Sequence, residues 1–219
     1  MTRKLTIIGL ILVLMAASAS AGIFNRGEKG SGDLVETDYD LDTCTSILLE
    51  CGLDIDITFG NKQSVTLIMD DNLVEYYDID ERSGTLVVDA DDNPRPSRKA
   101  RLELTLRSLD EVKIEGAGDI NIEDFDDDEL VIEIEGAGDI EATGKVERLE
   151  IEVNGAGDID TRGLKAQDAN VVINGAGDVK VYASKSCDVV INGVGDVDVY
   201  GKPENFHKNV NGIGDVDRK

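Results

Sequence analysis

One short motif recurs six times in the second half of this 219-residue chain and limits what the chain can fold into. Each copy reads Glu or Asn, Gly, a small or apolar residue, Gly, Asp, and then Ile or Val. The aspartates of the six copies are Asp119, Asp139, Asp158, Asp178, Asp196 and Asp215, at intervals of 20, 19, 20, 18 and 19 residues. Such a period predicts a stack of similar units, each of which buries its apolar side against its neighbours.

The residues on both sides of the motif are β-branched in every copy. Those before it are Ile114, Ile134, Val153, Ile173, Ile191 and Val210, and those after the aspartate are Ile120, Ile140, Ile159, Val179, Val197 and Val216. Two such columns are typical of parallel in-register strands with one buried face. Leucine-rich repeats have a similar period, but their asparagine and leucine framework and their helical segments are missing here.

The sequence therefore predicts an all-β fold, a parallel β-helix (β-solenoid) with coils of about 19 residues. We expect it to be right-handed, because parallel crossovers almost always are. The Gly-x-Gly part of each motif reverses the chain direction between two strands, where glycine tolerates unusual backbone angles. Position x is Ala in four copies, then Val194 and Ile213, and is also expected to point inward.

The first 21 residues have the organisation of a secretory signal peptide. Thr2-Arg3-Lys4 gives a positive start, Leu5 to Met15 an apolar stretch, and Ala19-Ser20-Ala21 a small-residue cleavage site. A retained membrane anchor is the alternative, because the uncharged run is near the lower length limit for a span. We expect an exported protein, found in the periplasm, at the cell surface or secreted.

The rest of the chain divides by the regularity of its pattern. Residues 22–33 are polar and glycine-rich and are expected to form a flexible lead. Residues 34–219 are expected to form the β-helix domain. Within it, residues 34–110 read as degenerate coils that continue and cap the solenoid, and residues 111–219 as the regular Gly-Ala-Gly-Asp coils.

Composition excludes some partners. The chain has 46 acidic and 22 basic residues, a formal net charge of −24, with 4% aromatic residues and no tryptophan. Nucleic acids and anionic membrane surfaces both require a basic surface, so neither is an expected partner.

The six motif aspartates are the candidate binding residues, and we call them the aspartate column. In register, their carboxylates would stand about 4.8 Å apart and repel one another. Two arrangements would relieve this: hydrogen bonds from backbone N–H groups of each aspartate's own glycine turn, or a row of Ca²⁺ ions, which prefer oxygen ligands. We expect the turn bonds, with weak Ca²⁺ binding as an addition and no other cofactor.

Two other polar groups stand out. The first motif position is Glu115 and Glu135 in the first two copies, and then Asn154, Asn174, Asn192 and Asn211. Stacked asparagines predict an amide ladder between coils. The acidic run over residues 124–129 is expected to lie in a solvated turn and not at a metal site.

Three cysteines leave an odd one. An exported protein can form disulfides, and Cys44 and Cys51 are close enough in sequence to pair, although two separate buried thiols fit equally well. Cys187 aligns with apolar residues of the other coils, which predicts a buried, unreactive thiol. That column is Leu130, Leu149, Ala169, Cys187 and Phe206.

The repeated Gly-Ala-Gly-Asp turns, with the closing segment Val199-Tyr200-Gly201-Lys202-Pro203 and its final Asn211-Gly-Ile-Gly-Asp copy, resemble the head domain of auto-transporter adhesins, the GIN domain. The resemblance covers about residues 34–219. It implies a right-handed β-helix exported to the envelope or surface of a bacterium. The family supplies no catalytic residues to carry over.

Little in the sequence indicates catalysis. His207 is the single histidine, and there is no nucleophile elbow, zinc motif or phosphate-binding loop. We expect a non-enzymatic protein that presents an acidic repetitive surface to an envelope or surface ligand, either a glycan or a protein. A polysaccharide lyase or hydrolase acting on one face is the alternative. Self-association through the solenoid ends is a further expectation.

Overall fold

The computed structural model describes residues 27–91, 94–97 and 99–219. The predicted signal peptide over residues 1–21 lies outside these residues, as does the start of the predicted lead. Within the described part of the chain, no helix is long and apolar enough to cross a membrane.

The described chain consists of strands and a single short 3-10 turn, η1 (Val74–Tyr76). The strands are β1 (Leu34–Tyr39), β2 (Ser46–Leu49), β3 (Asp54–Phe59), β4 (Ser64–Asp70), β5 (Tyr77–Arg82), β6 (Thr85–Ala90), β7 (Arg101–Leu106), β8 (Glu111–Ile114), β9 (Ile120–Ile134), β10 (Ile140–Val153), β11 (Ile159–Ile173), β12 (Val179–Ile191), β13 (Val197–Tyr200), β14 (Asn205–Val210) and β15 (Val216–Arg218). All fifteen belong to one continuous hydrogen-bonded sheet that winds around the core.

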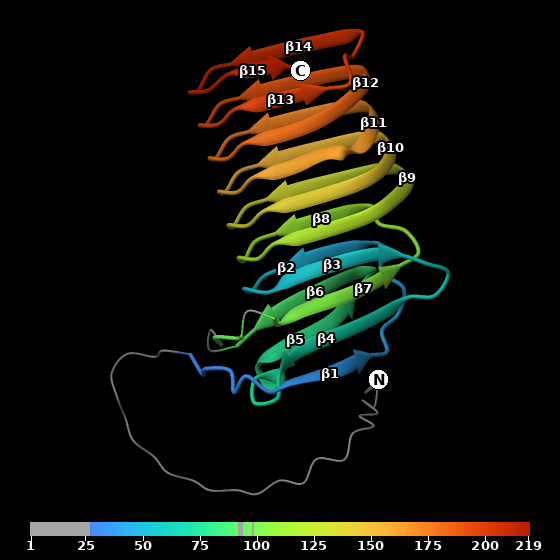
Figure 1. The fold of residues 1–219 in the computed structure, drawn as a ribbon, viewed down its shortest axis with the longest axis vertical. Coiled ribbons are helices and arrows are strands. Elements are labelled where there is room, and N and C mark those ends of the chain that lie inside the picture. Colours follow the sequence, from blue (N-terminus) through green and yellow to red (C-terminus); the bar gives the residue numbers. More distant parts are fainter. Residues whose placement is uncertain (1–26, 92–93, 98) are drawn as a thin grey trace, which may run out of the picture.

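Strands β8–β15 form the regular coils, stacked in parallel along the long axis (Figure 1). Both β-branched columns are in register: Ile120 pairs with Ile140, and so on to Val216, while Ile114 pairs with Ile134, and so on to Val210. All members of the two columns except Val210 are buried. The predicted parallel β-solenoid and its coil length are confirmed.

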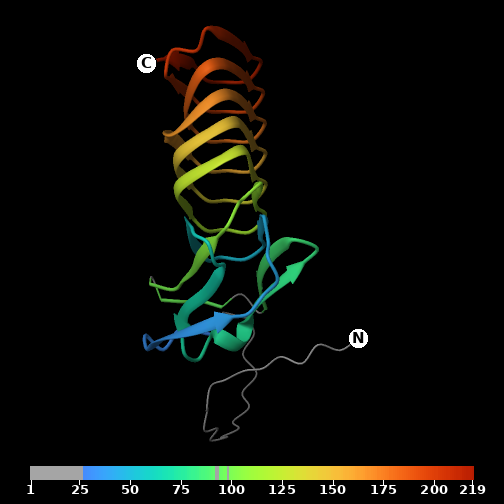
Figure 2. The ribbon, with the colours of Figure 1, turned by 90° about the vertical axis from the view of Figure 1, so that its right-hand side faces the viewer.

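Strands β9 to β12 are 13 to 15 residues long because each continues around a bend opposite the glycine turns (Figure 2). The acidic run over residues 124–129 lies within β9, where the strand bends, and not in a turn, but its carboxylates are exposed to solvent as predicted. Asp124 has φ 58° there, and Gly144 of the next coil has φ 126°. The bend also buries Phe125 at the core, edge-on to Phe59 with 5.5 Å between ring centroids.

The cysteine column is built as predicted. Cys187 is paired in register with Ala169 and Phe206, and its side chain is fully buried. Burial, aided by Asp188, raises the pKa of its thiol to about 12. Cys44 and Cys51 are both buried free thiols in this structure, which corresponds to the second of the two alternatives and not to a disulfide.

The N-terminal region departs from a simple continuation of the coils. Strands β2 and β3 form a coil that stacks on β8 and β9, and β6 and β7 form the next coil beyond it, so the stacking does not follow chain order. Strands β4 and β1 then add in antiparallel fashion beside β7, and β5 pairs antiparallel with β6. The predicted degenerate coils are therefore two parallel coils capped by antiparallel strands (Figure 1).

Residues 28–33, which we call the N-terminal strap, are fixed to this cap by hydrogen bonds and do not form a free lead. The Gly30 N–H donates to the Arg95 carbonyl at 3.0 Å, and the Gly32 N–H donates to Asp70 Oδ1 at 2.7 Å. The buried Asp70 carboxylate also accepts the Ser97 N–H at 2.7 Å. Burial alone would raise the pKa of Asp70, but these backbone bonds outweigh it and lower the pKa.

Candidate functional site

An open groove of about 590 Å³ runs along the face that carries the aspartate column, from β7 to β12. Two columns of outward side chains form its floor: the aspartates and the residues two positions after them. The second column consists of Asp56, Asn121, Glu141, Asp160 and Lys180, which neighbour one another in register. Lys99 and Arg101 line the end nearest the cap, so the groove is acidic along its length with cations at both ends.

The aspartate column is held together by backbone N–H groups, but not by those of each aspartate's own turn. The Asp139 N–H donates to Asp119 Oδ1 at 3.1 Å, and the Asp158 N–H donates to Asp139 Oδ1 at 2.8 Å. The same bond repeats up to Asp215 at 2.8 Å. We predicted that the donors belong to each aspartate's own turn, and this was wrong. In-register stacking places the N–H of the next coil's aspartate against the carboxylate instead.

A seventh aspartate extends the column toward the cap. The Asp119 N–H donates to Asp54 Oδ1 at 3.2 Å, and the Ile55 N–H donates to the Asp119 carbonyl at 2.9 Å. Sequence analysis missed Asp54 because Cys51 and Leu53 stand in place of the two motif glycines. The recoverable signal was the Asp-Ile-x-Ile pattern that follows in both coils. We call the seven residues together the aspartate ladder.

One oxygen of each bonded ladder carboxylate is occupied by a backbone donor. Among the described residues, no group of three or more His, Cys, Asp or Glu side chains is arranged to hold a metal ion. Ca²⁺ binding at the column therefore stays a prediction. The groove presents the outward carboxylate edges to hydroxyl, amide or cationic groups of a ligand, to which carboxylates act as acceptors.

The asparagine ladder is confirmed. Each amide nitrogen donates to the amide oxygen of the preceding coil, at 2.8 Å for Asn174 to Asn154, 2.8 Å for Asn192 to Asn174, and 3.0 Å for Asn211 to Asn192. These bonds join the last four of the six motif turns, next to the aspartate ladder.

The two glutamates at the start of that column are held by a residue that sequence analysis missed. Lys113 Nζ lies 3.1 Å from carboxylate oxygens of both Glu115 and Glu135, and 3.7 Å from Glu133. Hydrogen bonds to Glu115 and Glu135 raise the pKa of Lys113. Lys113 aligns with Glu133 and Glu152 of later coils. A basic residue at a position that is otherwise acidic could have identified Lys113 in the sequence.

The residue between the motif glycines points outward, contrary to expectation. Ala117, Ala137, Ala156 and Ala176 are exposed, and Val194 and Ile213 are 51% and 73% exposed. The flanking glycines face the backbone of the preceding coil, so the residue between them faces solvent. The turn apices therefore form a narrow apolar ridge beside the groove.

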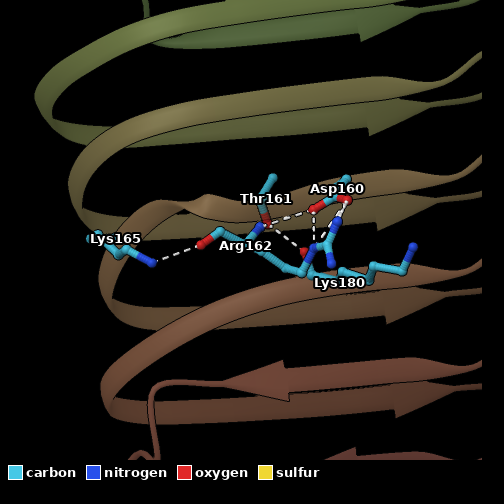
Figure 3. A network of polar contacts seen from close by, with 5 residues as sticks. All are labelled: Asp160, Thr161, Arg162, Lys165 and Lys180. Atoms are coloured by element: carbon cyan, nitrogen blue, oxygen red, sulfur yellow. Dashed lines mark hydrogen bonds and ion pairs between the residues drawn. The ribbon is translucent and has the colours of Figure 1, made fainter. Parts of the chain in front are cut away.

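Near the end of the groove closest to the C-terminus, Arg162, Lys165 and Lys180 add cationic side chains from β11 and β12 (Figure 3). Arg162 makes a two-pronged ion pair with Asp160, with nitrogen–oxygen distances of 2.6 and 2.9 Å. This contact lowers the pKa of Asp160. Lys165 Nζ lies 4.1 Å from the centre of the Tyr182 ring and donates to the Arg162 carbonyl at 2.9 Å.

The single histidine lies away from the groove. His207 is on β14, paired in register with Asp188 in the second half of β12, whereas the groove is formed by the first halves of the coils. The histidine and the groove carboxylates are therefore not brought together.

A family described as "Putative auto-transporter adhesin, head GIN domain" matches residues 44–203. Among solved structures, a "putative adhesin" from Bacteroides fragilis is 22% identical, with a TM-score of 0.72 over 88% of this chain and 100% of that chain. A "putative lipid binding protein" from Parabacteroides distasonis is 18% identical, with a TM-score of 0.50 and the same coverage of both chains. No curated protein matches the sequence. At these identities, the solved structures show a shared fold.

Proposed function

We propose, from the premise that the chain belongs to the GIN-domain family of auto-transporter adhesins, that it is an exported, non-enzymatic binding protein of adhesin type. Its ligand, a glycan or a protein of the envelope or cell surface, would lie along the groove over the aspartate ladder. The signal-like pattern of residues 1–21 supports export.

The observation that carries the proposal is the groove itself. Its floor is made of side chains from successive coils whose backbones are hydrogen-bonded in register, so their spacing is fixed before any ligand arrives. A preorganised surface loses less conformational entropy on binding than a mobile loop does. An extended ligand parallel to the solenoid axis could contact five coils at once.

A lyase or hydrolase would need a positioned acid and base near the scissile bond. No specific observation favours this reading, because the groove carboxylates repeat without a distinct pair and His207 lies on another part of the coil. We therefore propose binding alone at this surface.

The test is binding of the mature chain, residues 22–219, to immobilised neutral and acidic glycans and to matrix proteins. Glu141→Arg places a long side chain of opposite charge on the groove floor, and we expect it to weaken groove binding by roughly tenfold or more. Glu150→Arg is the matched control, since Glu150 is exposed on the same strand but does not line the groove.

Equal binding by both variants would contradict the groove as the site. The same ligands are incubated with the protein and assayed for new reducing ends. Specific cleavage that a single carboxylate substitution abolishes would overturn the non-enzymatic proposal.

A further inference from the structure

Within the regular solenoid, the acidic charge is concentrated at the end nearest the N-terminal coils. The coil over residues 111–134 has ten acidic residues and one basic residue, a net charge of −9. The next coils have six and two (135–153, net −4), three and two (154–173, net −1), and two and two (174–191, net 0). The coils of β11 and β12 therefore have almost no net charge, and they repel an anionic ligand less than the acidic coils do.

On this neutral part, one outward column changes its chemistry. The position four residues after the ladder aspartate is Glu123 or Thr143 in the early coils, but Arg162, Tyr182 and Tyr200 in the later ones. Tyr182 and Tyr200 are paired in register on adjacent strands and are both half-buried. Two of the five tyrosines of the chain thus lie side by side on one face.

Cations surround the two rings. Lys165 Nζ lies 4.1 Å from the centre of the Tyr182 ring, and Arg162 Cζ lies 5.9 Å from the centre of the Tyr200 ring. Lys180 lies two residues before Tyr182 on the same face of β12, between Asp160 of β11 and Asp198 of β13 in register (Figure 3). Arg162 is paired with Asp160. In the described part of the chain, neither Lys165 nor Lys180 makes a direct ion pair with a carboxylate, although the charge of Lys180 helps to lower the pKa of Asp160.

We propose that this surface, formed by Arg162, Lys165, Lys180, Tyr182 and Tyr200, binds an acidic polysaccharide. The two lysines would pair with carboxylate or sulfate groups, because a cation without a carboxylate partner gains most from an anionic ligand. The tyrosine rings would pack against the C–H face of a sugar ring, and their hydroxyls would bond to its oxygens. This site shares Lys180 with the end of the groove, but its other four residues do not line the groove, so it is proposed in addition to the groove ligand.

Other anionic partners fit less well. Strand β12 is hydrogen-bonded to β11 on one side and to β13 on the other, so an acidic peptide finds no free edge to extend the sheet. A nucleic acid duplex or a membrane is wider than this patch and would meet the −9 coil. A single polysaccharide chain at β12 lies three coils, roughly 14 Å, from that coil, which exceeds the Debye length of about 8 Å in physiological salt.

The experiment measures binding of polygalacturonate oligomers to residues 22–219 by calorimetry, with carboxyl-reduced oligomers, dextran and poly-glutamate as comparison ligands. We expect binding of polygalacturonate that weakens as salt is raised, and little binding of the other three. Lys165→Gln with Lys180→Gln should weaken it by roughly tenfold. The matched control is Lys62→Gln with Arg107→Gln, the same loss of charge at two exposed positions outside the patch.

Tyr182→Leu separates a sugar site from a purely electrostatic one, and we expect it to weaken polygalacturonate binding several-fold without changing the salt dependence. Melting curves of all variants confirm folding. Equal loss in the lysine and control variants, no binding of polygalacturonate, or equal binding of poly-glutamate would each overturn the proposal. Lys165→Gln alone should weaken polygalacturonate binding and leave groove binding intact, because Lys165 does not line the groove, so failure here and failure of the groove proposal are distinguishable.

Discussion

The regular coils and the N-terminal coil of β2 and β3 form the same turn with different residues. In the regular coils, a Cβ added at Gly136 or Gly157 would overlap backbone oxygen atoms of the preceding turn. In the N-terminal coil, the corresponding positions are Cys51 and Leu53, which carry full side chains. The turn conformation alone therefore does not require glycine.

The difference lies in what each turn stacks on. The turn of β2 and β3 has no similar turn beneath it, because β6 and β7 of the next coil are joined by the longer segment 91–100. Every later turn lies directly on another turn. Glycine is needed where one turn packs closely on another. The first turn of the stack packs on no other turn, so it can carry side chains at these positions.

Gly157→Ala should lower the free energy of unfolding more than any other substitution that tests this comparison. The added methyl group has to displace the Gly138 backbone, so we expect a loss of about 3 kcal/mol in the free energy of unfolding. Gly84→Ala is the control: Gly84 has φ +89° but open space around it, so the cost is backbone strain of about 1 kcal/mol. Urea unfolding measures both. A smaller loss for Gly157→Ala than for Gly84→Ala would show that the stacked turns can separate cheaply.

Substitution of Asp70, which lies in the N-terminal cap, should have the second largest effect on the free energy of unfolding. Asp70→Ala removes the buried acceptor of the Gly32 and Ser97 N–H groups, which should cost about 2 kcal/mol and release the N-terminal strap. Hydrogen exchange of the Gly32 amide measures the release. Asp91→Ala, at an exposed position near the cap, is the control and should leave that amide protected.

The same carboxylate gives a pH dependence with a defined sign. Because the pKa of folded Asp70 is lowered, its ionised form stabilises the fold above the unfolded pKa of about 3.9, and this contribution is lost as the pH falls through the lower folded value. The melting temperature of Asp70→Ala should therefore fall less than that of the wild type between pH 5 and pH 2. Parallel curves would contradict this role.

Lys113 sharpens the comparison between the first two regular coils and the later ones. Lys113→Met leaves Glu115, Glu133 and Glu135 without their cation, and we expect a loss of about 1 kcal/mol at pH 7 that shrinks toward pH 4, where glutamates take up protons. High salt should also reduce the loss. Lys62→Met is the control, and an equal loss there would show that only the net charge matters.

Much of the regular region could be predicted from the sequence, because each coil contacts only its neighbours and the period fixes the register. The Cys187 column and the asparagine ladder follow from that register alone. The N-terminal order could not be predicted, since β2 pairs with both β6 and β8 across long sequence separations. Asp54 was hidden by Cys51 and Leu53, whose side chains fit only where no turn lies beneath.

The groove was predicted only in part. Its aspartates follow from the motif, but the direction of their hydrogen bonds depends on where the next coil places its N–H. The pairing of Tyr182 with Tyr200 follows from the motif spacing, but the place of Lys165 beside Tyr182 depends on the register shift between Thr161 and Ala166. A period of 18 to 20 residues does not fix such positions.

The aspartate ladder gives the smallest expected effect and tests what holds it. Asp158→Asn keeps the oxygen that accepts the Asp178 N–H and removes one of several like charges, so stability should change by less than about 0.5 kcal/mol. Asp158→Ala loses that acceptor and should cost about 1 kcal/mol. If backbone donors suffice, melting temperatures in chelator and in millimolar Ca²⁺ are equal. A higher melting temperature in Ca²⁺ that Asp158→Asn abolishes would instead show that cations bridge the carboxylates, since a ligand of the folded state raises stability in proportion to its binding.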